Sequence, residues 1–434
     1  MELPRLKTFL TREQIAQRQL LQLNELLQAI VPANLFYTKK LLPIRDLKFS
    51  SLAQFTENVR FTIKQDLVED QKANPLFGTN LTFPLDRYTR LHQTSGTSGA
   101  PLRWLDTPEN WQWMTDNWKE VFRVAGVQRS DRVYFAFSFG PFIGFWLAFD
   151  AAAQLGCLCI PGGGLSSEAR LRGMLDNEAT VLCCTSTYAL RLAEVAAENG
   201  IDLRSAKIKT LLVAGEPGGS IPATRQRIEQ AWPGVRVFDH HGMTEVGPVT
   251  YECPVEPGVL HVIETAYLAE VIAPDGSVAK ANEPGELILT TLGRTGSPLV
   301  RYRTGDLVKR GEFKQCRCGR HEMRLEGGIL ARSDDMVIVR GVNIYPSAVE
   351  EILRSFEEVA EYRVHLIQTT DLPELSIEIE AVEKCADDRS LARAVEKKLQ
   401  TALSLRVPVR CVARGTLPRF EMKARRWVKG ETLP

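Results

Sequence analysis

The chain has 434 residues, too many for one ordinary hydrophobic core, so two or three domains are expected. Lysine and arginine total 54 against 53 aspartates and glutamates, with no long block of either sign, which excludes the electrostatic pattern of a nucleic-acid or membrane-surface binder. Nine cysteines are an odd number, and charge interrupts the N-terminal segment, so neither a disulfide framework nor a secretory signal is predicted. We therefore expect a reduced, cytoplasmic protein whose partners are small molecules, with no nucleic acid and no membrane among them.

The first part of the chain contains two helices with clear start signals and one long apolar stretch. Thr11 and Gln14 have the spacing of a capping box, which predicts a helix over residues 12–30. A Thr–Pro pair predicts a second helix over residues 108–125. Residues 133–149 carry no charge, but they are fewer than the roughly 20 that a membrane span needs. A buried strand, a tight turn and a buried helix are expected there.

The rest of the chain changes pattern twice. From residue 133 to 239, short apolar runs alternate with helical patterns, which is typical of βαβ units and a largely parallel sheet. Residues 260–308 read as strands alone, and the C-terminal segment follows a β-α-β-β-α-β order. We predict an α/β fold with a large N-terminal domain over residues 1–332, made of βαβ sheets and a β-rich subdomain, and a small α+β C-terminal domain over residues 333–434.

Residues 92–101, HQTSGTSGAP, lie between two predicted strands. Such a run makes either a plain hairpin turn or a nest of backbone N–H groups that binds an anion, and it lacks the Gly-Lys-Ser/Thr ending of a P-loop ATPase. Further short motifs follow along the chain: AGEPGG at 214–219, DHHGMTE at 239–245, YRTGD at 302–306, ARSDD at 331–335, RGVN at 340–343 and LPRFEMKARR at 417–426. Each motif alone is a weak indication, but together and in this order they are specific.

This ordered set resembles the adenylate-forming superfamily of acyl-CoA synthetases, and most closely its short members of the phenylacetate-CoA ligase type, over roughly residues 30–430. The resemblance implies a mobile C-terminal domain and a reaction in two steps. A carboxylic acid and ATP give an acyl-adenylate and pyrophosphate, and a thiol, usually coenzyme A, then displaces AMP to give a thioester. Because a carboxylate must approach a polyanionic triphosphate, such a site needs donors and cations that neutralise charge and align the attack.

The resemblance also implies a nucleotide site. The phosphate loop is expected to comprise Thr94, Ser95, Gly96, Thr97, Ser98 and Gly99. Two further nucleotide-binding segments are expected to comprise Gly215, Glu216 and Pro217, and Asp239, His240, His241, Gly242 and Met243. At His241 the chain departs from the family, which usually has an aromatic residue just before this glycine to stack on adenine.

Five single residues receive roles from the resemblance. Thr244 is expected beside the α-phosphate, and Glu245 is expected to hold Mg²⁺ against the phosphates. Asp306 is expected to accept both ribose hydroxyls, a task that suits an acceptor-only carboxylate. Arg332 is expected near the ribose and phosphate, and Lys423 is expected to bridge the α-phosphate and the carboxylate in the first step. Thr244, Glu245 and Lys423 are therefore the candidate catalytic residues.

The remaining implied positions concern movement and the two other substrates. Asp334 matches the hinge of the C-terminal domain, and Gly341 lies where the family lets the pantetheine arm pass close to the backbone. Phe137, Phe139 and Gly140 match the region that borders the acyl pocket. Because flat apolar walls favour a ring over a flexible chain, a small aromatic or arylacetic acid is the expected substrate.

A separate constellation comprises Cys253, His261, Cys316 and Cys318, with His321 nearby. Thiolates and an imidazole from a β-rich region suit tetrahedral Zn²⁺ in a closed structural site. The Cys-x-Cys spacing is tighter than usual, and unligated thiols in a loop are the competing interpretation. The sequence leaves open whether His261 or His321 completes the site.

The leading functional prediction is an ATP-dependent acid:CoA ligase that uses ATP, Mg²⁺ and CoA. An adenylating enzyme that loads a carrier-protein thiol is the alternative within enzymes, and a non-catalytic nucleotide-binding relative is the alternative outside them. Glu245, Asp306, Arg332 and Lys423 each stand where catalysis requires them, which argues against the non-catalytic alternative. The resemblance also implies a homodimer as the expected oligomeric state.

Overall fold

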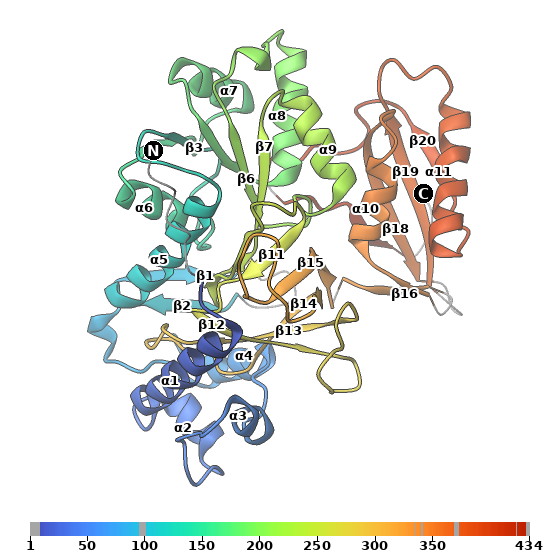
Figure 1. Cartoon of the computed structure of the whole chain (residues 1–434). Helices are drawn as coiled ribbons and strands as arrows, with labels where there is room; N and C mark the ends of the chain where they lie inside the picture. Colours follow the sequence, from blue (N-terminus) through green and yellow to red (C-terminus); the bar gives the residue numbers. More distant parts are fainter. Residues whose placement is uncertain are drawn as a thin grey trace. The chain divides into compact units, whose positions relative to one another are not determined.

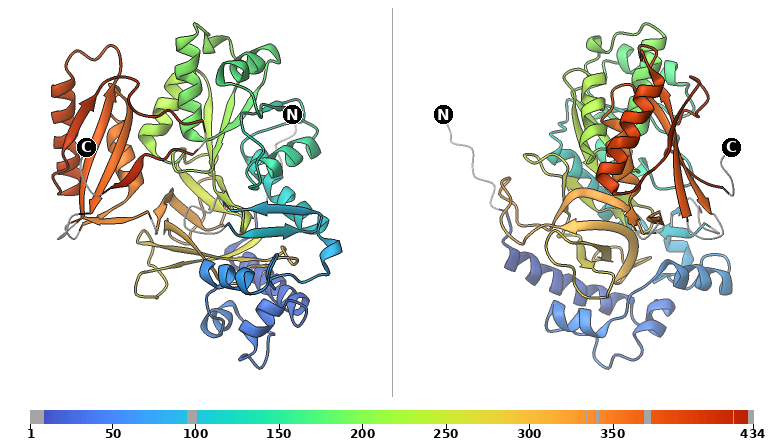
Figure 2. Two further views of the ribbon diagram at one scale, coloured as in Figure 1. Left: turned by 180° about the vertical axis from the view of Figure 1, so that it is seen from behind. Right: turned by 90° about the vertical axis from the view of Figure 1, so that its right-hand side faces the viewer.

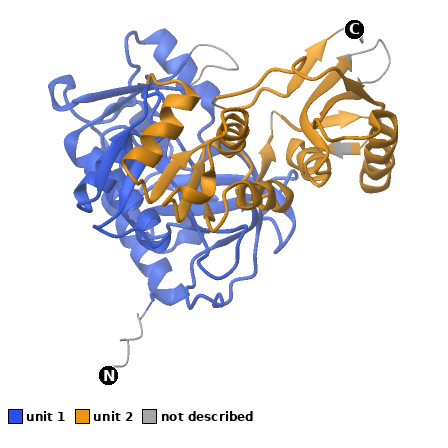
Figure 3. Cartoon of the chain, turned by 90° about the horizontal axis from the view of Figure 1, so that it is seen from above, with its two compact units in different colours: residues 1–163, 240–328 blue, residues 164–239, 329–434 orange. Residues whose placement is uncertain are grey.

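The computed structural model describes residues 9–94, 101–333, 335–339, 342–368, 373–421 and 423–430. The chain divides into two compact units, unit 1 with residues 1–163 and 240–328, and unit 2 with residues 164–239 and 329–434 (Figure 3). Each unit is therefore built from two stretches that are distant in the sequence. In the described part of the chain, no helix is both long and apolar enough to cross a membrane.

The sequence predicts the start of two helices of unit 1, at residues 12 and 108, and both begin there. The helices of unit 1 are α1 (Arg12–Ile30), α2 (Leu35–Leu41), α3 (Leu52–Asn58), α4 (Lys64–Ala73), the short 3-10 helix η1 (Leu85–Arg87), α5 (Pro108–Val124) and α6 (Trp146–Gln154). All of them except η1 are labelled in Figure 1. The capping box of α1 is confirmed, because the Thr11 hydroxyl accepts from the Gln14 N–H and the Gln14 side chain accepts from the Thr11 N–H. The uncharged stretch from residue 133 to 149 is confirmed as a strand, a turn and the start of α6.

Besides one larger sheet, the strands of unit 1 include an antiparallel hairpin and a parallel pair. The hairpin β1 (Arg90–Gln93) and β2 (Arg103–Asp106) is antiparallel, whereas β3 (Arg132–Phe135) pairs in parallel with β4 (Leu158–Pro161). The larger sheet has the order β10-β11-β15-β14-β13-β12. Its strands in chain order are β10 (Thr250–Glu252), β11 (Val259–Val262), β12 (Tyr267–Ile272), β13 (Pro284–Thr291), β14 (Tyr302–Arg310) and β15 (Arg324–Arg332).

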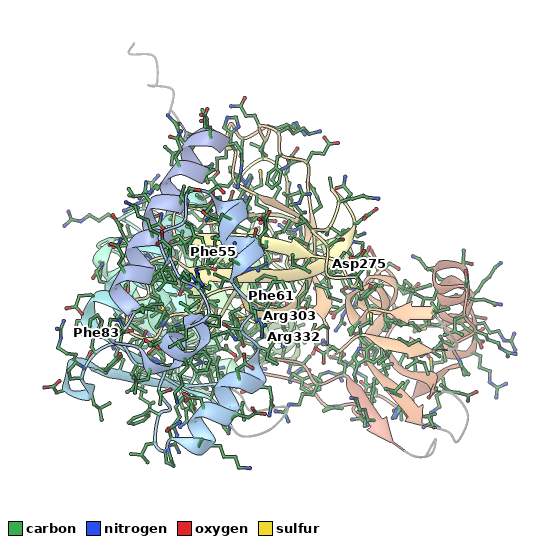
Figure 4. All side chains as sticks on the ribbon, turned by 90° about the horizontal axis from the view of Figure 1, so that it is seen from below. Phe55, Phe61, Phe83, Asp275, Arg303 and Arg332 are labelled. Atoms are coloured by element: carbon green, nitrogen blue, oxygen red, sulfur yellow. The ribbon has the colours of Figure 1, made fainter. Side chains whose placement is uncertain are left out.

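The N-terminal helices pack against the larger sheet. Buried side chains of α1 to α3 share one apolar core with Leu268, Leu292 and Val300. Arg301, which has a left-handed φ of 46°, stands directly before β14 and pairs with Glu270 at 2.7 Å. The Phe61 ring lies 4.2 Å from the Arg301 guanidinium and 5.8 Å from that of Arg303, and Figure 4 shows Phe61 beside Arg303. These contacts hold the first residues of β14 in place.

The first stretch of unit 2 continues the predicted strand–helix alternation. It contains α7 (Ser167–Asp176), β5 (Val181–Cys184), α8 (Ser186–Glu198), the 3-10 helix η2 (Leu203–Ser205), β6 (Thr210–Ala214), α9 (Pro222–Ala231) and β7 (Arg236–His240). Strands β5 and β6 are parallel and almost wholly buried, which explains their continuous apolar sequence.

The second stretch of unit 2 is an α+β fold. It contains the hairpin β16 (Val337–Val339) and β17 (Val342–Ile344), followed by α10 (Pro346–Arg354), β18 (Val359–Gln368), β19 (Pro373–Ala381), α11 (Asp388–Leu403), β20 (Val409–Val412) and β21 (Trp427–Gly430). The sheet order is β20-β19-β18-β21, and both helices share one apolar core with β18 and β19. In both views of Figure 2 the red helix α11 lies along this sheet. The mixed α/β fold class is thus confirmed.

Candidate active site

The predicted phosphate loop starts and ends on a paired hairpin. Thr94 follows β1, and its N–H donates to the Leu102 carbonyl at 3.0 Å, while the Leu102 N–H donates to the Thr94 hydroxyl at 3.0 Å. The two bonds close the base of the loop. Its other predicted members, Ser95, Gly96, Thr97, Ser98 and Gly99, lie outside the described residues.

The predicted catalytic pair occupies a tight turn. Thr244 and Glu245 lie between β8 (Gly242–Met243) and β9 (Gly247–Pro248), which pair antiparallel. Both side chains are largely buried, with residue exposures of 9% and 8%. Gly247 has a φ of 88°, and a Cβ on it would lie 2.8 Å from a methionine sulfur, so this turn requires glycine. The turn thus carries a hydroxyl and a carboxylate on consecutive residues.

A buried ion pair that the sequence analysis missed fixes this turn. Arg294 has no exposed surface, and its Nε and Nη2 donate to the two Asp106 carboxylate oxygens at 2.8 Å each. Its Nη1 donates to the carbonyls of Thr244 at 3.0 Å and Glu245 at 2.7 Å. Asp106 is the last residue of β2. One guanidinium therefore holds both the strand that follows the predicted phosphate loop and the turn of Thr244 and Glu245.

Asp306 lies in an irregular part of β14. The pairing with β13 shifts register between Glu286 and Ile288, and Gly305 has a left-handed φ of 76° that suits glycine. The Gly305 N–H donates to Glu286 Oε1 at 3.1 Å, and the Asp306 N–H donates to the Thr304 hydroxyl at 3.0 Å. The YRTGD motif is therefore a β-bulge that holds the Asp306 backbone in place.

In the second predicted nucleotide motif, Asp239 and His240 are buried, whereas the His241 side chain contacts Asp306. His240 is buried and its Nδ1 lies 2.6 Å from the Thr250 carbonyl; burial lowers its pKa to about 3, so the ring is neutral at physiological pH. Asp239 is buried too, and its carboxylate accepts from the Ser220 hydroxyl. His241 is different, since its Nε2 lies 2.9 Å from Asp306 Oδ2. This brings two residues with predicted nucleotide roles together.

In unit 2, the predicted lysine lies against the GEP motif. A Cβ on Gly215, which follows β6, would lie 3.4 Å from Cε of Lys423. Glu216 accepts from the Thr187 N–H at 2.8 Å with one oxygen and from the Ala424 N–H at 2.9 Å with the other. The Glu216 carboxylate thus anchors the residue next to Lys423.

The other predicted site residues of unit 2 are Pro217, Arg332, Asp334 and Gly341. Pro217 accepts from the Ser186 hydroxyl at 3.3 Å through its carbonyl. Arg332, labelled in Figure 4, ends β15, and its carbonyl accepts from two backbone N–H groups, those of Asp335 at 3.1 Å and Met336 at 3.0 Å. The predicted hinge Asp334 and the predicted pantetheine position Gly341 lie outside the described residues.

Aromatic side chains gather in the segment after β3. The Phe137 ring centre lies 6.5 Å from that of Phe139 and 5.5 Å from that of Phe142, both edge to face. The Phe139 ring lies 4.7 Å from that of Trp146. A Cβ on Gly140 would lie 2.9 Å from the Phe142 ring, so ring and backbone are in close contact there. Because β3 ends at Phe135, the three phenylalanine rings belong to the connection between β3 and α6 rather than to the strand, and Trp146 is the first residue of α6.

The four candidate zinc ligands meet in space. Their ligand atoms all lie within 4.8 Å of one another, and His261, not His321, is the imidazole among them. Cys253 Sγ lies 3.7 Å from Cys316 Sγ, and Cys318 Sγ lies 3.5 Å from His261 Nε2. The hydrogen bond from Cys253 and the neighbouring His261 hold the pKa of Cys318 well below its ordinary value. Thiolate character and a tetrad of this size fit a tetrahedral metal.

A tight turn explains the short Cys-x-Cys spacing. The Cys316 N–H donates to the Arg320 carbonyl and the Gly319 N–H donates to the Cys316 carbonyl, each at 2.8 Å. Gly319 has a left-handed φ of 88°. The turn therefore brings both thiols to the same side, where they face the strand end of β10 and the strand β11.

Comparisons with known proteins agree with this arrangement. The model of the AMP-binding enzyme family matches residues 66–293, and that of the AMP-binding enzyme C-terminal domain matches residues 341–429. The chain is 31% identical to the phenylacetate-coenzyme A ligase of Pseudomonas putida over 84% of this chain and 82% of that one, and 30% identical to the enzyme of that name from Escherichia coli K12, with the same coverage. The chain belongs to the AMP-binding enzymes.

A solved AMP-binding enzyme has the same fold. A 2-hydroxyisobutyryl-CoA ligase in its postadenylation state is 26% identical, with a TM-score of 0.92 over 99% of this chain and 94% of that one. The predicted membership of the adenylate-forming superfamily, on its phenylacetate-CoA ligase-like side, is confirmed. So is the predicted activity, which is ATP-dependent activation of a carboxylic acid by an AMP-forming acid–thiol ligase.

Replacing Arg294 tests whether the buried pair serves the site. Arg294→Lys keeps the positive charge but removes the guanidinium that the Asp106 carboxylate shares with the carbonyls of Thr244 and Glu245. Each charge-assisted hydrogen bond of this kind contributes about 1.5–3 kcal/mol to the free energy of unfolding. We expect kcat/KM for MgATP in ATP–pyrophosphate exchange to fall about tenfold or more, and the free energy of unfolding to fall by about 3 kcal/mol.

Arg301→Lys is the matched control, because Arg301 is a buried, paired arginine of unit 1 that also donates to two backbone carbonyls, but not to those of Thr244 and Glu245. It should lose similar stability and keep its kcat/KM for MgATP. Equal kinetic losses in the two variants would contradict the role of Arg294.

Proposed function

We propose that the protein activates a small aromatic carboxylic acid and transfers the acyl group to coenzyme A. The observation that carries the substrate class is the cluster of Phe137, Phe139 and Phe142 after β3, together with the close approach of the Gly140 backbone to a ring. Flat apolar walls favour a ring over a flexible chain. Two relatives at about 30% identity are named for phenylacetate, which supports the same class.

The first half-reaction forms the acyl-adenylate. A carboxylate oxygen attacks the α-phosphorus, the bond to the β-phosphate bridge breaks, and pyrophosphate leaves. We assign the Thr244 hydroxyl and the Lys423 ammonium to the α-phosphate, and Asp306 and Arg332 to the ribose side. Glu245 offers carboxylate oxygens, which suit Mg²⁺, and the ion would neutralise charge on the phosphates. The anchor from Glu216 to the Ala424 N–H supports a fixed position for Lys423.

The second half-reaction forms the thioester. The thiol sulfur attacks the carbonyl carbon, the carbon–oxygen bond to the phosphate breaks, and AMP leaves with that oxygen. One lysine at the α-phosphate has no role in this step, so we propose that the C-terminal domain over residues 333–434 pivots at Asp334 between the steps. Gly341 would then let the pantetheine arm approach the backbone.

An acid panel tests the substrate class and the acceptor. ATP–pyrophosphate exchange should be fastest with benzoate, hydroxybenzoates or phenylacetate, and at least tenfold slower with acetate, hexanoate, 2-hydroxyisobutyrate and amino acids. Active acids should give a thioester with CoA alone. Preference for aliphatic acids would contradict the aromatic assignment, and exchange without any CoA thioester would favour a carrier-protein acceptor.

Lys423→Ala is the control that links the activity to the assigned site. It should lose exchange and still convert supplied acyl-adenylate and CoA to thioester. Equal loss of both half-reactions would contradict its assignment to the first step.

We also propose that Cys253, His261, Cys316 and Cys318 hold one structural Zn²⁺. Four ligands leave no open position for substrate, and the site joins the connection before β15 to β10 and β11. Metal binding at such a site stabilises the fold, because the unfolded chain has no preformed site.

Metal analysis tests this site. Purified protein should contain about one zinc per chain, and Cys316→Ser should lower the zinc content and the melting temperature by several degrees. Cys411→Ser, at a partly exposed thiol of the C-terminal stretch, is the control and should change neither. A fully folded, metal-free wild type with the stability of the zinc-loaded protein would contradict the proposal.

A further inference from the structure

His241 stands where the family usually has an aromatic residue, and its ring contacts the predicted ribose carboxylate. Nε2 lies 2.9 Å from Asp306 Oδ2, and the two side chains are 12% and 4% exposed. An ionised carboxylate only accepts hydrogen bonds, so Nε2 carries the proton and donates. A phenylalanine ring at this position would offer no hydrogen-bond donor.

Both partners are held by their own backbones. The His241 N–H donates to the Thr250 hydroxyl at 3.0 Å, and the His241 carbonyl accepts from Val249 N–H at 2.9 Å and Thr250 N–H at 3.2 Å. Asp306 is held by the bulge of β14, where its N–H donates to the Thr304 hydroxyl. The contact between the two side chains therefore joins two fixed backbones.

We propose that His241 is a positioning residue for ribose recognition: its Nε2–H orients the Asp306 carboxylate, so that the remaining acceptor sites face the nucleotide hydroxyls. A carboxylate has about four lone-pair sites, so Oδ2 accepts from the imidazole and still accepts from a ribose hydroxyl. The inference rests on the proposed nucleotide role of Asp306. Under this proposal, the main contribution of His241 is to preorganise the sugar site and not to stack on adenine.

Nucleotide analogues separate the two roles. Dissociation constants for MgATP and for 2′,3′-dideoxy-ATP, which lacks both ribose hydroxyls, are measured by calorimetry on wild type and on His241→Phe. Because an oriented, charge-assisted bond is lost, His241→Phe should bind MgATP about tenfold more weakly and the dideoxy analogue less than twofold more weakly. His241→Gln, which restores an N–H donor, should recover part of the MgATP affinity, and His241→Leu should match His241→Phe.

Asp306→Asn completes a double-mutant cycle. If His241 acts through Asp306, adding His241→Phe to Asp306→Asn should cause little further loss of MgATP affinity. Equal losses for MgATP and the dideoxy analogue, or a full second loss in the double variant, would overturn the proposal. Failure of wild type to bind MgATP at all would instead contradict the proposed function, so the two failures are distinguishable.

Discussion

The buried ion pair between Arg294 and Asp106 is the constraint on which the arrangement of unit 1 depends. It joins the end of β2, to which the predicted phosphate loop returns, to the carbonyls of Thr244 and Glu245. A guanidinium without exposed surface is tolerated only when its donors are satisfied, and here a carboxylate and two carbonyls satisfy them. The turn is therefore fixed before a nucleotide binds, and a preorganised site needs no rearrangement as charge develops.

Local patterns predicted much of this molecule. The capping box before α1 needs only residues three positions apart, and the alternating apolar runs predicted the strands and helices of the first stretch of unit 2. The cysteine and histidine tetrad was also predicted, because thiols and imidazoles are chemically distinctive wherever they stand. The choice between His261 and His321 required the structure, since it depends on the pairing of β10 with β11.

Contacts between distant and ordinary residues were not predictable. Asp106 and Arg294 are 188 positions apart, and Glu216 and Ala424 are 208 positions apart. Asp106 and Arg294 are common residue types outside the motifs that the sequence singles out, and the partner of the Glu216 carboxylate is a backbone N–H, which leaves no trace in the sequence. For the same reason the sequence indicated that His241 is unusual but not that it contacts Asp306.

In the proposed activation step, a carboxylate oxygen of the substrate attacks the α-phosphorus of ATP. The most direct measurement uses benzoate or phenylacetate labelled with ¹⁸O in both carboxylate oxygens, ATP, Mg²⁺ and CoA, with mass spectrometry of the phosphate-containing products. Because the attacking oxygen stays with phosphorus when the thiol displaces the adenylate, one ¹⁸O should appear in AMP and none in pyrophosphate. Label in orthophosphate, with ADP as the nucleotide product, would contradict the account.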